Sequence, residues 1–242
     1  MSGSKSLSIG ANPVDEDRPP YAPLLAAGDA DVIGFEAEPA RPGGTRRQEG
    51  ALRDLPRPTR VGDGGRHTLN ICFAPGMTSC SSQNPAVLNL FHGFPTGARW
   101  SPPRPSDTVR LDDVAETAGA EMLKIDIQGG ELMAMRARRC GRCCDMLVIH
   151  TEVEFLPMYV DQPLFSDVDQ FLRKHGFVLH RFAPTVSRTI APLLVNNNIY
   201  AGMSQLLWAD AVFVKDFTRL ELFTERQLLS MATIMHDCYQ SF

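Results

Sequence analysis

The sequence lacks any apolar run long enough to cross a membrane, for which a helix needs about 20 residues. Its first residues, MSGSKSLSIGAN, also lack the apolar core of a secretory signal peptide. These two absences predict a soluble, cytoplasmic protein with no membrane partner.

A basic excess is missing as well. The 242 residues carry 24 Lys and Arg against 28 Asp and Glu, a formal net charge of −4. Proteins that bind nucleic acid usually present a basic domain or stripe, so the composition predicts no nucleic-acid partner. The locally basic run at 136–142 falls on an expected helix, where we interpret it as a solvated face.

Cysteine is scarce and does not form a metal-binding pattern. There are six cysteines, and three of them form the cluster C-x2-C-C at Cys140, Cys143 and Cys144. A zinc site of this type needs a second pair of ligands at a suitable distance, and none is evident. We therefore interpret the cluster as free thiols at a helix end, as in a reducing compartment.

The clearest local pattern is LKIDIQGGE at 123–131. Apolar residues alternate with Lys124 and Asp126, and the β-branched isoleucines favour a strand. Two glycines break this run, and good helix formers follow from Glu131. The pattern predicts a strand, a turn and a helix, with Asp126 at the strand end where open α/β sheets bind ligands. Alternatively, Asp126 caps the helix and Glu131 favours its dipole.

Strands and helices alternate through most of the chain, which predicts one α/β domain over 1–242 with a doubly wound, mostly parallel sheet. An irregular segment separates the last two strands, so the last strand is expected to run antiparallel. Two Pro- and Gly-rich stretches are expected to be a mobile segment at 37–57 and an irregular loop at 75–107. The expected strands are 6–12, 31–35, 59–61, 68–73, 123–127, 146–151, 178–182 and 211–214, and the expected helices are 21–29, 48–55, 110–117, 131–139, 167–175 and 221–239.

The first half lacks the fingerprint G-x-G-x-x-G of dinucleotide sites, and it lacks the Walker lysine pattern. Gly10 and Asn12 follow the first expected strand, and Glu36 follows the second, where an acid suits a ribose diol. A nucleoside cofactor without phosphates fits this arrangement, and S-adenosylmethionine is such a molecule. Its ribose would meet Glu36, its adenine would meet Asp63, and its amino-acid end would meet the glycine turn.

The chain resembles FkbM-type S-adenosylmethionine-dependent methyltransferases in five segments that follow the order of that family. The resemblance implies a Rossmann-like sheet with a final antiparallel strand. It also implies methyl transfer to oxygen, on a hydroxyl of a glycan or small metabolite. The segments are IGAN (9–12), GFEAEP (34–39), VRLDDV (109–114), LKIDIQGGEL (123–132) and VIHTEVEF (148–155).

Methyl transfer to an alcohol needs an in-line arrangement and benefits from a positioned base. The candidates are Asp126, which is also a candidate cofactor contact, and His150 and Glu152, at the ends of neighbouring strands. His150 and Glu152 share one strand face with Glu154. The alternatives are a hydrogen-bonded structural histidine with solvated acids, or a divalent Mg2+ or Mn2+ site on the same trio, which we do not favour.

The sequence therefore predicts a cytoplasmic O-methyltransferase with S-adenosylmethionine as its cofactor and a small-molecule or glycan hydroxyl as its acceptor. One rival is a nicotinamide-dependent oxidoreductase, against which the missing glycine fingerprint counts. The other is a non-catalytic module that retains the methyltransferase fold. Ser8 and Pro13 favour this second rival, because the family usually has an acid and a glycine at these positions.

Overall fold

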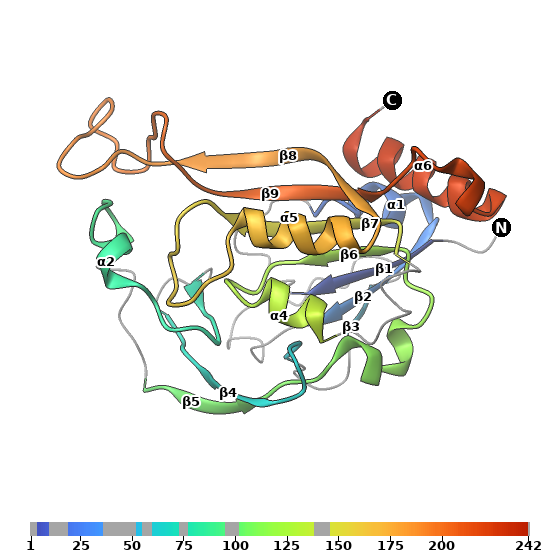
Figure 1. The fold of residues 1–242 in the computed structure, drawn as a ribbon, viewed down its shortest axis with the longest axis horizontal. Helices are drawn as coiled ribbons and strands as arrows, with labels where there is room; N and C mark the ends of the chain where they lie inside the picture. Colours follow the sequence, from blue (N-terminus) through green and yellow to red (C-terminus); the bar gives the residue numbers. More distant parts are fainter. Residues whose placement is uncertain are drawn as a thin grey trace.

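The computed structural model describes residues 4–9, 19–35, 52–54, 60–72, 77–94, 102–137 and 146–241, with backbone alone at 4–9 and 52–54. Figure 1 shows the ribbon. The strands are β1 (Ser4–Ile9), β2 (Ala30–Phe35), β3 (Leu52–Asp54), β4 (Arg66–Leu69), β5 (Arg104–Asp107), β6 (Met122–Ile125), β7 (Val148–Glu154), β8 (Phe177–Ser187) and β9 (Leu206–Lys215). The helices are α1 (Ala22–Ala27), α2 (Pro85–Leu88), α4 (Glu131–Arg136), α5 (Phe165–Lys174) and α6 (Glu225–Tyr239).

Seven of these strands form one sheet in the order β3-β2-β1-β6-β7-β9-β8. The five strands from β3 to β7 in this order pair in parallel. β9 runs antiparallel to both of its neighbours. The predicted α/β class, the mostly parallel sheet and the antiparallel last strand are therefore confirmed. β4 and β5 form a separate antiparallel pair.

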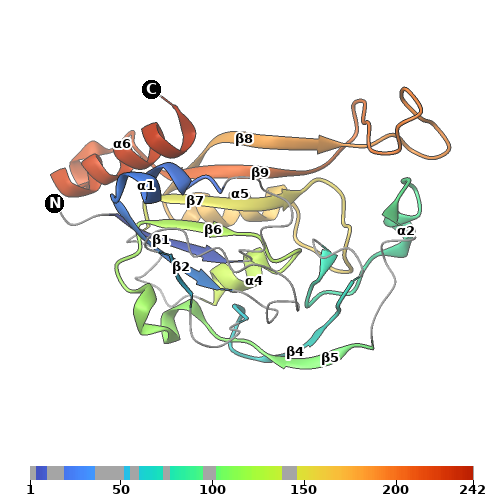
Figure 2. The ribbon, with the colours of Figure 1, turned by 180° about the vertical axis from the view of Figure 1, so that it is seen from behind.

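Helices cover both faces of the sheet, with α4 and α5 on one face and α1 and α6 on the other (Figures 1 and 2). The side chains of β6 alternate between the two layers, as the pleat of a strand requires. Leu123 and Ile125 pack in the cluster that contains residues of α4 and α5. Met122 packs in the other cluster, with Leu24 of α1 and Ile234 of α6.

Local signals set the helix ends. Gly176 has a φ of +78°, as expected for the glycine that follows a helix. Thr224 and Gln227 form a capping box, because each side chain accepts from the other's backbone N–H, at 3.3 and 3.0 Å. The predicted last helix therefore begins at Glu225, and the residues Leu220–Leu222 before it form a separate 3-10 turn.

Several predicted elements are wrong. The expected helix at 48–55 contains β3 instead, because pairing of Leu52 with Val32 overrides the local helix propensity. Val61 forms an isolated bridge to Val109 and not a strand of the sheet. The expected strand at 68–73 is β4, which ends at Leu69 and pairs outside the main sheet. The expected helix at 110–117 is a pair of 3-10 turns, Leu111–Asp113 and Ala115–Thr117. The expected irregular loop at 75–107 contains α2 and β5.

Three loops gather beyond the carboxyl ends of the parallel strands (Figure 1). The loops at 77–94 and 155–164 are joined by a bridge between Gln83 and Tyr159. The loop at 188–205 joins the first of these through a bridge between Phe91 and Ile190. Buried apolar side chains, including Tyr159 and Leu207, pack between them. None of the helices within the described ranges has the length and apolarity to span a membrane.

Candidate active site

The turn between β6 and α4 is closed by Glu131, the first residue of the helix. Its Oε1 accepts a hydrogen bond from the Ile127 backbone N–H (2.7 Å), and its Oε2 accepts one from Gly129 (2.9 Å). Glu131 thus satisfies two backbone donors of the turn that precedes the helix. The N-cap residue is Gly130 and not Asp126, so the alternative in which Asp126 caps this helix is wrong.

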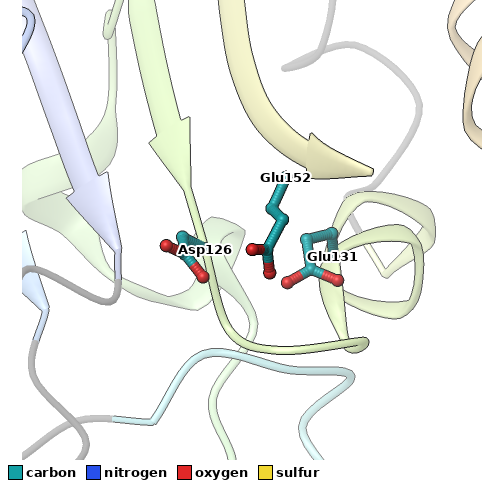
Figure 3. Close-up of side chains that lie close together, drawn as sticks. All are labelled: Asp126, Glu131 and Glu152. Carbon is teal, nitrogen blue, oxygen red and sulfur yellow. The ribbon is translucent and has the colours of Figure 1, made fainter. Parts of the chain in front are cut away.

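Three carboxyl groups meet at this edge of the sheet, and we call them the acid cluster: Asp126, Glu131 and Glu152 (Figure 3). One oxygen of each lies within 4.8 Å of the others. Asp126 follows β6, Glu131 begins α4 and Glu152 lies near the end of β7. The parallel pairing of β6 and β7 brings Asp126 and Glu152 together. Glu131 and Glu152 are buried, whereas Asp126 is partly exposed.

Gln128 connects two members of the acid cluster. Its Nε2 donates to Asp126 Oδ1 (2.9 Å) and to Glu152 Oε2 (2.7 Å). Its Oε1 accepts a hydrogen bond from the Tyr159 hydroxyl (3.1 Å). From the sequence, Gln128 had no predicted role, Glu131 was only an alternative partner for the helix dipole, and Tyr159 had no predicted role. The pattern D-x-Q-x-x-E in the turn was the available signal for the first two, because it places their polar groups beside Asp126.

Burial dominates the electrostatics of the acid cluster. The pKa of Glu131 is raised to about 7, mainly by desolvation and to a smaller extent by the neighbouring Asp126, whereas its backbone hydrogen bonds oppose the rise. Desolvation, followed by Asp126, raises the pKa of Glu152 well above its usual range. Desolvation and Glu131 do the same for the pKa of Glu154. Acids that exchange protons near neutral pH in a ligand-binding position are candidates for function.

His150 does not lie with the acid cluster. Its Nδ1 is 3.1 Å from the Tyr239 hydroxyl of α6, and its Nε2 is 3.2 Å from Asp210 Oδ2 of β9. The His150 side chain is buried, and its imidazole ring contacts the ring of Tyr239 on α6 at a tilted angle. This placement supports the structural role that the sequence left open for His150, and it does not support the predicted role as the base.

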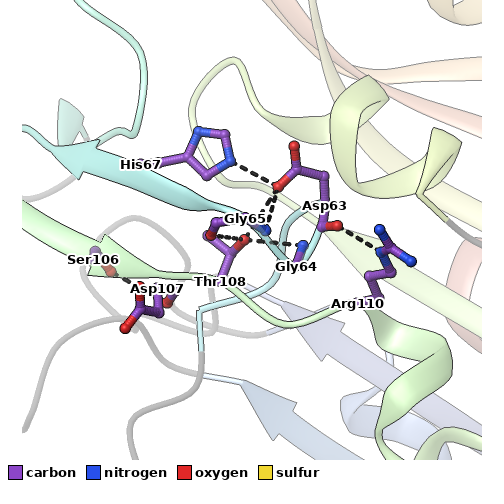
Figure 4. A network of polar contacts seen from close by, with 8 residues as sticks. All are labelled: Asp63, Gly64, Gly65, His67, Ser106, Asp107, Thr108 and Arg110. Atoms are coloured by element: carbon purple, nitrogen blue, oxygen red, sulfur yellow. Dashed lines mark hydrogen bonds and ion pairs between the residues drawn. The ribbon is translucent and has the colours of Figure 1, made fainter.

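Asp63 lies in the turn before β4, within the polar network of Figure 4. Its Oδ1 is 2.7 Å from His67 Nε2 and accepts from the Gly65 N–H at 2.8 Å. The hydrogen bond with His67 is the main reason that the pKa of Asp63 is lowered. Arg110 Nε donates to the Asp63 carbonyl at 2.6 Å. The contact of Asp63 with adenine stays a prediction.

The other predicted cofactor residues, Gly10, Asn12 and Glu36, fall outside the described residues. The strands that precede them are described. Ile9 at the end of β1 pairs with Phe35 at the end of β2 and with Ile125 at the end of β6. Three strands thus end level with one another, and Asp126 follows the third.

Apolar side chains are exposed on the loop at 188–205, which we call the flap. The guanidinium of Arg188 lies over the rings of Tyr200 (5.6 Å) and Trp208 (5.4 Å), which anchors the flap to β9. The flap contacts the loop at 77–94 through the N–H of Ala191, which donates to the Leu90 carbonyl. The exposed apolar residues here are Leu90, Ile190, Leu193, Leu194, Ile199, Tyr200 and Met203.

A mostly parallel sheet with helices on both faces defines an α/β protein, and the acid cluster lies at the edge where such sheets bind ligands in general. Residues 8–179 match the family model of the methyltransferase FkbM domain, and the chain belongs to that family. The match confirms the resemblance inferred from the five segments. Neither a curated protein nor a solved structure matches the chain.

Proposed function

We propose that this protein is an S-adenosylmethionine-dependent O-methyltransferase that acts on a hydroxyl of a glycan or small metabolite. The observation that carries the proposal is the pair Asp126 and Glu152 at the ends of adjacent parallel strands in an FkbM-domain sheet. The strand order and the helices on both faces support a doubly wound, Rossmann-like fold. In such folds ligands bind where the strand order reverses, beside the first strand.

The residues at this edge suit the proposed cofactor. S-adenosylmethionine supplies a methyl group that is activated by a positively charged sulfur. Asp126, Glu131 and Glu152 place three carboxyl groups at the end of β6, level with the ends of β1 and β2 in the same sheet. Glu36, Gly10 and Asn12 follow those two strand ends in the sequence. We assign Glu36 to the ribose, the glycine turn to the amino-acid end and Asp63 to the adenine.

Glu152 is the best placed base for the acceptor. In the reaction, the bond between sulfur and the methyl carbon breaks while the bond between the acceptor oxygen and that carbon forms. The acceptor hydroxyl proton passes to the Glu152 carboxylate. A base works best when its pKa is near the working pH, and the raised pKa of Glu152 moves it in that direction. Asp126 lies beside the methyl-donating end.

A metal role for the site is not favoured. The carboxyl groups that lie together are Asp126, Glu131 and Glu152, so His150 is replaced by Glu131 in the predicted set. Both Glu131 oxygens already accept backbone hydrogen bonds, which reduces their capacity to bind Mg2+ or Mn2+. We expect methyl transfer to continue after treatment with a chelator, and loss of activity that added Mg2+ restores would establish the metal role.

The cytoplasmic location belongs to the same proposal. Cys72, Cys80 and Cys238 are free thiols, which supports a reducing compartment. Fractionation of cells that express the full chain tests this location, and recovery of the protein outside the cytoplasm would contradict it.

Calorimetry with S-adenosylmethionine, S-adenosylhomocysteine and NAD tests the function. We expect both sulfur compounds to bind and NAD not to bind. Asp126→Asn should weaken binding of S-adenosylmethionine about 10- to 100-fold, as expected for the loss of a charged partner. Asp113→Asn, at an exposed position of a 3-10 turn, is the matched control. Binding of NAD alone would establish the oxidoreductase instead, and binding of none would establish the non-catalytic module.

Transfer of labelled methyl groups to a panel of hydroxylated acceptors then tests the reaction. The panel should contain glycans and small metabolites, each beside an analogue in which the hydroxyl is replaced by hydrogen. Label in the hydroxylated member alone supports transfer to oxygen. Equal labelling of both members would place the methyl group on another atom and contradict this part of the proposal.

A further inference from the structure

Gln128 has a backbone conformation that side chains rarely adopt. Its φ is +58°, in the left-handed region where a Cβ atom is crowded. The Ser79 hydroxyl donates a 2.6 Å hydrogen bond to the Gln128 carbonyl, so a distant part of the chain fixes this turn. Unfavourable backbone conformations persist where the surrounding structure holds them, and they gather at functional sites.

The orientation of the Gln128 amide follows from its partners. The NH2 group has two hydrogens and no acceptor, and it faces one oxygen of Asp126 and one of Glu152. A reversed amide would point its oxygen at both carboxyl groups, which is unfavourable. The Tyr159 hydroxyl donates to Oε1 and also lies 3.4 Å from the Met77 carbonyl. Tyr159 is buried, and its hydroxyl holds the oxygen of the amide while the two acids hold the nitrogen.

A neutral donor has a particular value between two acids. Adjacent carboxylates repel each other, and a hydrogen bond to each of them favours the ionised form. Lysine or arginine in the same place would also supply donors, but it would cancel the negative charge that attracts a sulfonium group. The Gln128 amide stabilises the two carboxylates and leaves their charge intact.

We propose that Gln128 is a positioning residue that holds Asp126 beside the positively charged sulfur of the cofactor and Glu152 beside the acceptor hydroxyl, and that its two hydrogen bonds favour the ionised form of both acids. This inference rests on the proposed function. The amide is already engaged by three side chains, so it acts through the two acids and not on the substrate. Tyr159 is the second part of the same device, because it fixes the amide.

The surrounding charges make the two acids sensitive to the loss of these donors. The charged groups that raise the pKa of Glu152 are all acidic. Lys124 lies two residues before Asp126, so their side chains are expected on the same face of the sheet. Replacement of the amide by an apolar group should therefore shift both carboxyl groups toward their protonated forms. The titratable groups that face Glu152 are Asp126 after β6, Glu131 of α4, Glu154 of β7, Asp210 of β9 and Tyr159 of the following loop.

An infrared titration of the carboxyl C=O stretch tests the proposal without cofactor. The variants are Gln128→Leu and Tyr159→Phe, and the control is Gln170→Leu on the exposed face of α5. We expect protonated carboxyl signal in Gln128→Leu to persist about one pH unit higher than in the wild type, which corresponds to a tenfold rise in proton affinity. Tyr159→Phe should shift in the same direction by less, and the control should titrate like the wild type.

Calorimetry then measures the consequence for binding. Gln128→Leu should weaken S-adenosylmethionine about 10- to 100-fold near neutral pH. Its effect on S-adenosylhomocysteine should be smaller, because that compound lacks the sulfonium charge. A wild-type titration midpoint in Gln128→Leu would overturn the proposal even if the cofactor binds. Shifted midpoints without binding of either compound would refute the proposed function and support the positioning of the acids. If Gln128→Leu does not fold, Tyr159→Phe decides by the same criteria.

Discussion

Glu131 offers a direct test of the electrostatics at the carboxyl edge of the sheet. Its burial and its hydrogen bonds to the turn have opposing effects on stability, and these effects can be separated by varying the pH. Its pKa is raised from 4.5 to about 7, mainly by burial. The folded protein therefore holds a proton at pH values where the unfolded chain has released it. The contribution of Glu131 to the free energy of unfolding is fully present below about pH 4.5 and is lost as the pH rises through about 7. At 1.36 kcal/mol per pKa unit, the loss is about 3 kcal/mol.

The substitution Glu131→Gln removes the titration and damages the turn. Glutamine has one acceptor oxygen, whereas Glu131 accepts from both Ile127 and Gly129. One buried backbone N–H then faces an NH2 group, which costs about 1–3 kcal/mol at every pH. We expect the variant to be less stable than the wild type near pH 4.5 and close to it above about pH 8, because the two effects then offset each other.

Urea unfolding at a series of pH values, followed by tryptophan fluorescence, measures this crossover. The control is Glu116→Gln, at an exposed position of a 3-10 turn. We expect the control to keep the wild-type dependence on pH. In Glu131→Gln, the free energy of unfolding should still depend on pH because Glu152 and Glu154 remain, and the pKa values of both are also raised. Parallel pH curves for the wild type and Glu131→Gln would refute the reasoning.

Three further predictions use other parts of the molecule. Glu36→Ala should cost about 1.5–3 kcal/mol of S-adenosylhomocysteine binding in calorimetry, as for a hydrogen bond to a charged group, and an unchanged affinity would reject the ribose assignment. His150→Ala should lower the free energy of unfolding by about 1–3 kcal/mol without weakening cofactor binding, because it leaves the buried Tyr239 hydroxyl without its histidine partner; a turnover loss of about 10²-fold or more at unchanged stability would instead support a base. Arg188→Ala should expose the flap to limited proteolysis earlier than in the wild type, since it removes the contacts to two aromatic rings, and identical cleavage rates would show that these contacts do not hold the flap.

Much of the sheet could be predicted because its signals are local. The run at 123–127 alternates over a few residues, and β6 contains the first three of them before the chain leaves the strand at Asp126. Gly176 could be placed at a helix end because few other residues tolerate its backbone conformation. β3 could not be predicted, because its three residues carry a helical pattern locally. Only their pairing with β2, which lies about 20 residues away, makes them a strand.

The candidate site was predictable only in part, for a related reason. Asp126 and Glu152 follow from the rule that ligands lie at the carboxyl ends of parallel strands. The part played by Gln128 depends on Tyr159, 31 residues later, and on Ser79, 49 residues earlier. No pattern of spacing along one chain reports such contacts. The sequence therefore predicted the carboxyl edge of the sheet and the acids Asp126 and Glu152, but not Gln128 and Tyr159, which hold them.

His150 shows that residues on the same face of a strand need not share a function. The alternation placed His150, Glu152 and Glu154 on one face of β7, and the structure agrees in that all three are buried. What covers each position differs along the strand. Tyr239 of α6 lies against His150, Asp126 and Glu131 lie beside Glu152, and the side chain of Gln162 lies beside Glu154. A step of two residues along a strand moves a side chain by about 7 Å. That distance separates a histidine held beneath a helix from an acid at the ligand edge, so the roles of neighbours on one face must be assigned from their surroundings and not from the face they share.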